Sequence, residues 1–314
     1  MPYITVVVPL HNKRAHIART IDSVLAQDYK DFELIVVDDA STDGGADIVR
    51  AYDDPRIRVL VRDRPGPGGY AARNLGIAEA DGTWIAFLDA DDEWDSFHLS
   101  AFLAEQKRHD GLGIYSSAYR KSLGSGRVEL SGRVARLGDA GGFQLIDFNG
   151  YLDSLVKAEQ AVWTSATIVR KSAFAKAGNF PDGKARRGGD TDTWLRLVSV
   201  CGAVGWNPRV SVTYHMDADN RVMQTSRNYE RFNVITATCD DIIARTTDVT
   251  TVALLRKVQA QKYYELAMAR KRHAGRWFYS LPETRARYFL DHPKNLLCLV
   301  PDPLFRALKK ISER

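Results

Sequence analysis

Three carboxylates directly follow an apolar, strand-like run in "IAFLDADDEW", residues 85–94: Asp89, Asp91 and Asp92. Like charges this close repel one another, and burial would strengthen the repulsion. A carboxylate pair at positions i and i+2 past a strand can hold one divalent cation while a diphosphate supplies further oxygen ligands. The alternative is an exposed acidic turn that caps the next helix. The motif therefore predicts either a cation site or a solvated turn.

A second carboxylate pair, Asp38 and Asp39, ends the apolar run "FELIVVDD" at residues 32–39. A carboxylate at this position can accept hydrogen bonds from a ribose hydroxyl or from the N–H of a nucleobase. The alternative is an N-cap for a helix near residue 43, a role that the following Ser-Thr-Asp segment can also fill.

The glycine-rich segment "GPGGYAARN", residues 66–74, would let the backbone approach a ligand closely, with Arg73 facing a phosphate or a base. It matches neither the Walker loop nor the dinucleotide-binding fingerprint, and loops of Gly and Pro are common. By itself this segment does not identify a ligand.

Two polar residues in the second half of the chain are further candidates. Asp190, in "RRGGDTDTW", begins a predicted helix after two glycines, where it can act as a general base or merely complement the helix dipole. His215 ends the strand-like run "RVSVTYH" and is a candidate metal ligand. The alternative for a lone histidine at a strand end is an ordinary surface residue.

Apolar runs alternate with segments of helical spacing through residues 1–110. Strands are predicted at 4–10, 32–39, 56–61 and 83–89, and the first intervening helix carries Ile17, Ile21, Val24 and Leu25. Continuous Val, Ile and Leu runs are typical of strands buried on both faces, so we expect an α/β fold with a mostly parallel sheet flanked by helices. In open sheets of this kind the ligand crevice lies at the carboxyl ends of the strands. Asp38 and Asp39 lie at the end of one predicted strand, and Asp89 and Asp91 lie at the end of another.

The later part of the chain has a different pattern. Shorter strands are predicted at 113–119, 160–170 and 209–215, with a helix beginning near residue 189. Residues 227–272 are predicted to be largely helical, and the remaining C-terminal segment mixes aromatic, proline and basic residues.

Composition and charge narrow the class of protein. The chain has 314 residues, of which 45% are hydrophobic and 26% charged, as in ordinary globular proteins. No run approaches the ~20 apolar residues that cross a bilayer. Cys201, Cys239 and Cys298 show neither metal-binding nor disulfide spacing, which predicts a reducing compartment. Residues 256–314 carry a net charge of +9 and the rest −4, so the tail predicts an acidic partner, either a membrane surface or nucleic acid.

The order of these motifs resembles glycosyltransferase family 2, the nucleotide-sugar-dependent enzymes of GT-A fold. "VVVPLHN" resembles the opening strand of the family, "FELIVVDDASTDG" its nucleotide-binding segment and "GGYAARNLGI" its next landmark. "WIAFLDADDEW" resembles its DxD region, and "GGDTDTWLRL" the region of its catalytic base. The resemblance implies a GT-A domain over 1–220, with a nucleotide-binding half at 1–110 and an acceptor-binding half at 111–220. A helical, basic C-terminal region would follow at 221–314.

The resemblance also implies roles for single residues. Pro9 and His11 would border the nucleobase, Asp39 would hydrogen-bond it, Arg73 would face the nucleotide, and Asp89 would contact the ribose. Asp91 would bind Mn²⁺ or Mg²⁺, with Asp92 a nearby alternative and His215 a further metal or diphosphate contact. Asp190 would be the general base of an inverting transfer.

The chain departs from the family pattern at two positions. Family members often carry Tyr where this chain has His11, which implies weaker or different stacking on the base. The usual Glu-Asp pair before the catalytic helix is Gly189-Asp190 here. The implied base is retained, whereas the contribution of that Glu to acceptor binding is left open.

The expected reaction moves a sugar from a nucleoside-diphosphate donor, with UDP-sugars favoured, to a saccharide or lipid-linked acceptor in bacterial polysaccharide or lipopolysaccharide assembly. The basic, aromatic tail resembles a membrane-surface anchor, which predicts a cytoplasmic protein peripheral to the inner face of the membrane. A solvated helical appendage or a dimer contact is the alternative for the tail. Nucleic acid is not an expected partner, because no RNA-binding motif accompanies the charge. The sequence does not predict the oligomeric state.

Two other classes of protein are alternatives. A nucleotidyltransferase would need a glycine-rich loop with basic residues near the N-terminus to hold a triphosphate, and "PLHNKRAHI" lacks one. A non-catalytic nucleotide- or sugar-binding homologue would keep the nucleotide site and lose the base.

Overall fold

The fold was established in a computed structural model, which describes residues 2–124, 126–138, 142–185, 187–216 and 234–274. The chain divides into two compact units, residues 1–226 and 227–314. The first unit contains all the residues that the sequence singles out for nucleotide binding, metal binding and catalysis.

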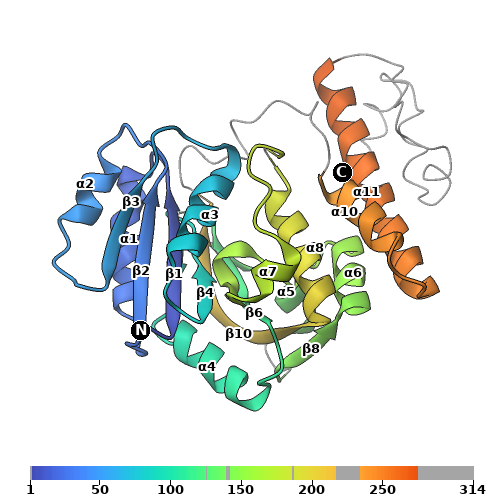
Figure 1. The fold of residues 1–314 in the computed structure, drawn as a ribbon, viewed down its shortest axis with the longest axis horizontal. Helices are drawn as coiled ribbons and strands as arrows, with labels where there is room; N and C mark the ends of the chain where they lie inside the picture. Colours follow the sequence, from blue (N-terminus) through green and yellow to red (C-terminus); the bar gives the residue numbers. More distant parts are fainter. Residues whose placement is uncertain (1, 125, 139–141, 186, 217–233, 275–314) are drawn as a thin grey trace. The chain divides into compact units, whose positions relative to one another are not determined.

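The first part of unit 1 is a parallel, helix-flanked sheet, as the sequence predicts (Figure 1). Strands β1, β2, β3 and β4 are parallel, in the spatial order β3-β2-β1-β4. The strands are β1 (Ile4–Leu10), β2 (Phe32–Asp38), β3 (Ile57–Val61) and β4 (Trp84–Phe87). The helices between them are α1 (Arg14–Leu25), α2 (Gly45–Arg50) and α3 (Tyr70–Glu79), the last preceded by the 3-10 turn η1 (Pro67–Gly69). Each strand therefore delivers its carboxyl end to the same edge of the sheet.

The sheet continues with mixed strand directions. Strand β9 is antiparallel to both β4 and β6, β10 is parallel to β6, and β5, β7 and β8 add antiparallel pairs. These strands are β5 (Glu93–Trp94), β6 (Ile114–Ser122), β7 (Val128–Leu130), β8 (Gln144–Asp147), β9 (Thr167–Arg170) and β10 (Ala203–His215). The remaining helical elements of unit 1 are α4 (His98–Arg108), α5 (Gly132–Leu137), α6 (Phe148–Val156), η2 (Thr164–Ala166), α7 (Ala173–Ala177) and α8 (Gly189–Cys201).

Two predicted strand boundaries differ from the structure. The strand expected at 160–170 begins only at Thr167, because a 3-10 turn over Thr164–Ala166 precedes it: the Ala166 N–H donates to the Trp163 carbonyl, and the Thr167 hydroxyl donates to the same carbonyl. The strand expected at 209–215 begins earlier, at Ala203. Pro208 lies inside it, and the pairing with β6 shifts register between Asn207 and Val210. Proline lacks the N–H that a regular ladder uses, so a strand tolerates it at such a bulge.

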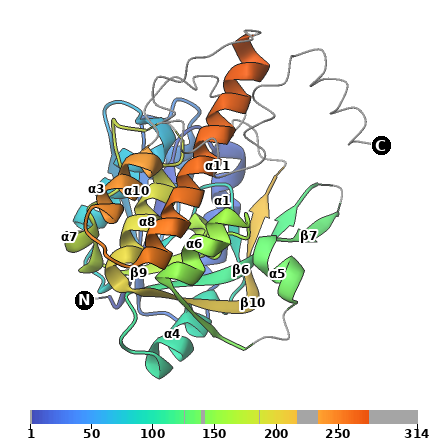
Figure 2. The ribbon, with the colours of Figure 1, turned by 90° about the vertical axis from the view of Figure 1, so that its right-hand side faces the viewer.

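Helices cover both faces of the sheet, and the alternate residues of β1 divide between them. Ile4, Val6, Val8 and Leu10 share one buried cluster with Ile17 and Ile21 of α1. On the opposite face, Val7 meets α3 at Gly76, where an added Cβ would lie 2.4 Å from a Val7 methyl carbon. Around β6 and β10, α4 lies on one side, and α6 and α8 lie on the other (Figure 2).

Unit 2 contains two described helices, α10 (Val234–Ile243) and α11 (Val249–Ala274). The Gln259 side chain of α11 donates hydrogen bonds to the Thr236 carbonyl and to the Asp240 carboxylate of α10, both at 2.9 Å. The predicted helical character is thus confirmed within the described part of 227–272. The aromatic and basic segment after residue 274 lies outside the described residues. No helix among the described residues combines the length and the apolar character needed to cross a membrane.

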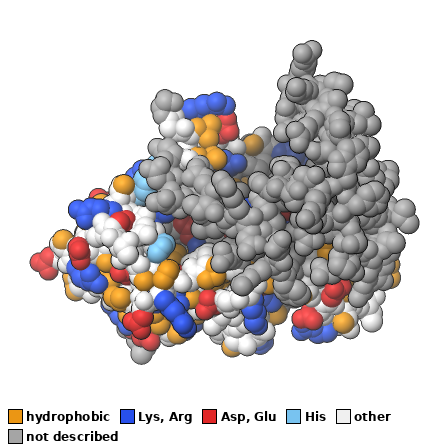
Figure 3. Space-filling model, turned by 90° about the horizontal axis from the view of Figure 1, so that it is seen from above, with side chains coloured by type: hydrophobic (Ala, Val, Ile, Leu, Met, Phe, Trp, Pro, Cys, Tyr) orange, Lys and Arg blue, Asp and Glu red, His pale blue; other side chains and the backbone are white. Residues whose placement is uncertain are grey.

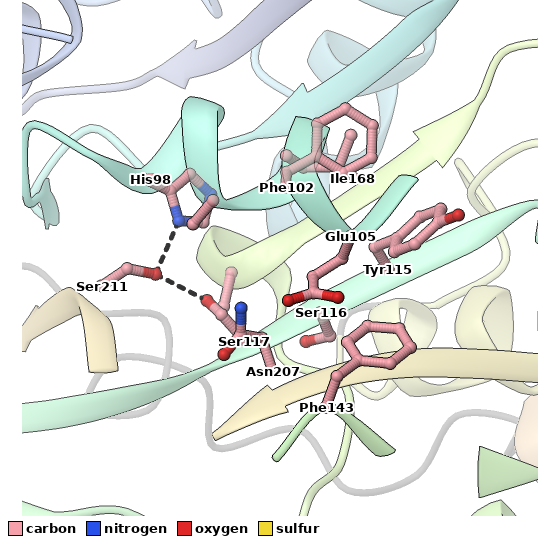
Figure 4. Close-up of a pocket in the computed structure, with 12 residues that line it drawn as sticks. His98, Phe102, Glu105, Tyr115, Ser116, Ser117, Phe143, Ile168, Asn207 and Ser211 are labelled. Carbon is pink, nitrogen blue, oxygen red and sulfur yellow. Dashed lines mark hydrogen bonds between the residues drawn. The ribbon is translucent and has the colours of Figure 1, made fainter. Parts of the chain in front are cut away.

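A buried histidine links α4 to the sheet (Figure 4). His98 stacks on Trp94 with ring centroids 4.3 Å apart, and its Nδ1 lies 2.8 Å from the Ser211 hydroxyl, which in turn donates to Ser117. Its Nε2 and the Ser116 hydroxyl have no hydrogen-bond partner among the described residues and border a cavity of about 20 Å³. Burial lowers the pKa of His98 to about 3.

Acidification should destabilise the fold through His98. The pKa of His98 in the folded state lies below the ordinary value of 6.5. Between pH 6.5 and about 3, the His98 imidazole therefore takes up a proton only in the unfolded chain. Stability is therefore fully present above pH 6.5 and falls by up to about 1.4 kcal/mol per pH unit as the pH drops. Urea unfolding at pH 7.5 and pH 5.5 measures the loss. Between these two pH values, the unfolding free energy of His98→Gln should fall by about 1 kcal/mol less than that of the wild type. An equal fall in the variant would contradict the assignment of this pH dependence to His98.

Candidate active site

The carboxyl ends of β1 and β2 are joined by hydrogen bonds around His11. The Asp39 N–H donates to the Leu10 carbonyl at 2.7 Å, and the exposed His11 ring places its Nδ1 2.7 Å from the Asp39 carbonyl oxygen. Asn12 has a φ of 51° and accepts a hydrogen bond from the Thr42 N–H at 2.8 Å. Figure 3 views this edge of the sheet, where acidic, basic and histidine side chains lie together. The "HN" turn is therefore anchored to the loop that follows β2.

Asp39 is buried and already has partners for both carboxylate oxygens. One oxygen forms an ion pair with Arg62, and the other accepts the Gly66 N–H at 3.0 Å. Its neighbour Asp38 accepts the Ser41 N–H at 3.0 Å, which is a turn-capping role. The sequence reasoning missed Arg62, although its position directly after β3, beside β2 in a parallel sheet, was an available signal.

Arg73 and Asp89 form the next pair along this edge. The Arg73 guanidinium is buried, pairs with the Asp89 carboxylate, and donates to the Gly68 carbonyl at 2.9 Å. Pro9 lies beside the same glycine loop, since its Cβ is 3.5 Å from where a Cβ on Gly69 would stand. The structure thus brings Pro9, Arg73 and Asp89 together, with the charge of Arg73 directed at Asp89.

Asp91 faces the N-terminal end of α1. Its Oδ2 lies 2.8 Å from the Lys13 ammonium, and both side chains are 12% exposed. The Asp91 carbonyl accepts a hydrogen bond from Arg19 at 2.9 Å, which fixes the backbone of the turn. Lys13 was not singled out from the sequence, because no local pattern places it near residue 91.

Asp92 is buried and links the turn after β4 to α1, η2 and β10. Its carboxylate accepts the Ser165 hydroxyl at 2.6 Å and the His215 N–H at 3.3 Å, and its carbonyl accepts the Thr20 hydroxyl at 2.8 Å. Burial, and then the charges of Asp91 and Asp89, raise the pKa of Asp92 well above its usual range. These contacts indicate a role in holding the ends of β4 and β10 together.

Asp190 lies in the first turn of α8. The Tyr70 hydroxyl accepts the Gly189 N–H at 2.9 Å. Burial raises the pKa of Tyr70, and the charge of Asp190 raises it further. Burial likewise raises the pKa of Asp89, Arg73 opposes that shift, and Asp91 and Asp190 add to it. The hydrogen bond between Gly189 and Tyr70 thus joins the first turn of α8, which contains Asp190, to the residue that follows the glycine loop.

The glycine at position 189 has a steric cause. A Cβ there would lie 2.6 Å from the Tyr70 ring and 2.8 Å from Pro181. Tyr70 thus occupies the space in which a side chain at 189 would begin. This explains the local departure from the Glu-Asp pattern, because a Glu at this position would clash with the buried ring.

The second acid of this helical turn, Asp192, has a different environment. It is buried and pairs with Arg196 at 2.9 Å. Arg196 also donates to the carbonyls of Gly178 and Asn179, both at 2.9 Å. Asp192 therefore positions the arginine that anchors the loop before α8.

A carboxylate such as that of Asp91 suits a hard divalent cation whose other ligands come from a substrate. Mg²⁺ sites that serve phosphates commonly use one or two carboxylates and take the remaining ligands from phosphate and water. Asp91 is a carboxylate of this kind, and a cationic group, Lys13, already stands beside it. His215 places its Nε2 3.2 Å from the Glu93 carboxylate. The described ranges contain no group of three or more His, Cys, Asp or Glu side chains that could hold a metal alone.

Comparisons with known proteins agree with this architecture. The profile described as "Glycosyl transferase family 2" matches residues 5–177. The chain is 48% identical over 138 residues to the succinoglycan biosynthesis protein ExoO of Rhizobium meliloti, covering 44% of this chain and 37% of that protein. It is 33% identical over 136 residues to the GalNAc(5)-diNAcBac-PP-undecaprenol beta-1,3-glucosyltransferase of Campylobacter jejuni, covering 42% and 43%. The matches thus span less than half the length of these relatives.

Two solved structures share the fold. TarS 1–349 of S. aureus in complex with UDP-GlcNAc superimposes with a TM-score of 0.69 at 18% identity, covering 96% of this chain and 84% of that one. The mannosyltransferase PcManGT of Pyrobaculum calidifontis, in complex with GDP-Man and Mn²⁺, superimposes with a TM-score of 0.58 at 18% identity, covering 100% and 88%. The family match covers more than half of the sequence, and the chain therefore belongs to glycosyl transferase family 2.

Proposed function

We propose that the protein is an inverting glycosyltransferase that moves a sugar from a nucleoside-diphosphate donor to a saccharide or lipid-linked acceptor. One observation carries the proposal: the Gly189 N–H at the start of α8 donates to the Tyr70 hydroxyl, and Tyr70 directly follows the glycine loop that Arg73 joins to Asp89, so the candidate base Asp190 and the candidate nucleotide site are linked through one loop. Residues 1–110 would bind the nucleotide, and residues 111–220 would bind the acceptor.

A UDP-sugar is the proposed donor, supported by the UDP-GlcNAc complex of the structurally similar TarS. Pro9 and His11 would border the base, Asp39 would accept its N–H, and Asp89 would contact the ribose. Arg73 would act on the nucleotide mainly through Asp89, because its guanidinium is buried against that carboxylate. Asp39 retains this capacity, since a carboxylate oxygen can accept a second hydrogen bond.

Asp91 is the proposed protein ligand of Mn²⁺ or Mg²⁺, with His215 a further contact to the metal or the diphosphate. The Mn²⁺ complex of PcManGT supports a metal in this fold. When bound, such a cation supplies positive charge that stabilises the leaving diphosphate. Arg19 donates a hydrogen bond to the Asp91 carbonyl and would hold the backbone of Asp91 in place while the diphosphate leaves.

Asp190 is the proposed general base. It would take the proton of the acceptor hydroxyl while that oxygen bonds to the anomeric carbon, and the bond from that carbon to the diphosphate oxygen would break with its electron pair. Attack from the face opposite the leaving group inverts the anomeric configuration. Tyr70 would hold the first turn of α8, since its hydroxyl accepts the Gly189 N–H.

A lipid-linked or polysaccharide acceptor is supported by the relatives, which are named for undecaprenol-linked sugar transfer and for succinoglycan biosynthesis. Peripheral attachment to the inner face of the membrane remains a prediction from the net charge of +9 over residues 256–314. Most of that segment lies outside the described residues.

Donor screening tests the proposed function. Thermal shift with a panel of UDP-, GDP- and other nucleotide sugars should single out one UDP-sugar, and coupled detection of UDP should then show turnover with an acceptor. The NMR anomeric coupling of the product should show inverted configuration. Retained configuration would refute the single-base mechanism. Donor binding without hydrolysis or transfer to any acceptor would favour a non-catalytic homologue.

A further inference from the structure

Lys13 stands where a cation would approach Asp91. Its ammonium lies 2.8 Å from the Asp91 Oδ2, and the pair is only 12% exposed on each side. Lys13 itself is the N-cap residue of α1 and follows Asn12, whose backbone and side chain are tied to Ser41 and Thr42. The start of the Lys13 side chain is therefore held in place, whereas its flexible four-carbon stem lets the ammonium move.

The other two carboxylates of the "DADD" turn have less mobile partners. Asp89 pairs with Arg73, whose guanidinium is also bound to the glycine loop. Asp92 accepts hydrogen bonds from Ser165 and from the backbone of His215. Asp91 is thus the member of the turn whose charge is balanced by a long side chain that can be exchanged for another cation.

We propose that Lys13 and the divalent cation occupy the Asp91 carboxylate in turn, and that the donor diphosphate takes up the Lys13 ammonium when the metal displaces it. The inference rests on the proposed metal role of Asp91. Two cationic groups on one carboxylate repel each other, so the metal alone must compete with Lys13. A diphosphate offers the displaced ammonium new anionic partners, so nucleotide and metal binding strengthen each other.

This exchange predicts a specific pattern of Mn²⁺ affinities. Lys13→Met should bind Mn²⁺ without nucleotide about threefold to tenfold more tightly than the wild type, the size expected for a partly buried ion pair. The increase in Mn²⁺ affinity caused by UDP should be correspondingly smaller in the variant. Both quantities follow from titrations of the full chain in which free Mn²⁺ is read by its electron paramagnetic resonance signal.

Matched variants distinguish the effect of the Lys13–Asp91 ion pair from the effect of removing any positive charge nearby. The Arg14 side chain is exposed and donates hydrogen bonds to the backbone carbonyls of Asp43 and Gly44. Arg14→Met removes this adjacent positive charge and should leave Mn²⁺ affinity within about twofold of the wild type. Lys13→Gln repeats the measurement with a polar, uncharged side chain. Asp91→Asn should abolish the binding in every background.

The outcomes distinguish this inference from the proposed metal site. Equal Mn²⁺ affinity in wild type and Lys13→Met, with binding lost in Asp91→Asn, would overturn the exchange and keep Asp91 as a ligand. The same tightening in Arg14→Met and Lys13→Met would also overturn it, because the effect would be one of net charge. Absence of Mn²⁺ binding in all forms, with and without UDP, would remove the metal site and the exchange together.

Discussion

Replacing Asp190 by Asn is expected to slow sugar transfer about 10²–10⁴-fold, the usual contribution of a general base. The amide keeps the shape of the carboxylate but cannot accept the proton of the acceptor hydroxyl. Donor affinity should change little, because Asp190→Asn removes an interaction that forms in the transition state and does not affect ground-state binding of the nucleotide. Initial rates of UDP release with acceptor, together with the Kd of the donor, measure the two effects separately.

Two neighbouring acids serve as comparisons for Asp190→Asn. Asp182→Asn removes an exposed carboxylate from the loop before α8 and should keep near-normal turnover. Asp192→Asn breaks the buried pair with Arg196, so it should lower thermal stability and reduce activity only as far as the fold is disturbed. Near-normal turnover in Asp190→Asn, alongside an inactive and stably folded Asp192→Asn, would show that Asp192 is the base.

Replacing Asp91 by Asn should abolish the metal-linked part of nucleotide binding. The wild type should melt at a higher temperature with UDP and Mn²⁺ than with UDP and EDTA, because a ligand that binds only the folded state stabilises it. In Asp91→Asn this difference should vanish. Transfer should fall roughly 10²–10³-fold, as expected when several kcal/mol of charge stabilisation on the leaving diphosphate are lost.

Asp92 provides the contrast within the same turn. Asp92→Asn leaves the Ser165 hydroxyl or the His215 N–H without its carboxylate partner, so the unfolding free energy should fall by about 1–3 kcal/mol. The difference between Mn²⁺ and EDTA should nevertheless persist. If instead the difference survived in Asp91→Asn and vanished in Asp92→Asn, the metal ligand would be Asp92.

The local periodicity of the sequence was sufficient to predict the parallel half of the sheet. The apolar runs of β1, β2 and β4 are buried along their length, and polar side chains follow each of them. Parallel strands end at a common edge, so the sequence also predicted that the Asp38–Asp39 pair and the "DADD" turn would lie at the carboxyl ends of the strands. The strand boundaries near Ser165 and Pro208 were less predictable, because a 3-10 turn and a proline bulge overrode the apolar pattern.

The sequence by itself determined which residues at the strand ends can do chemistry, and the tertiary structure decided which partner each one has. Arg62 reaches Asp39, Lys13 reaches Asp91, and Tyr70 accepts the Gly189 N–H across 119 residues of chain. Such pairs depend on the path of the whole chain and leave no local periodicity. They also decide the electrostatics, because a carboxylate paired with a guanidinium or an ammonium has a different capacity to bind a cation from one that accepts only hydrogen bonds from a hydroxyl and a backbone N–H.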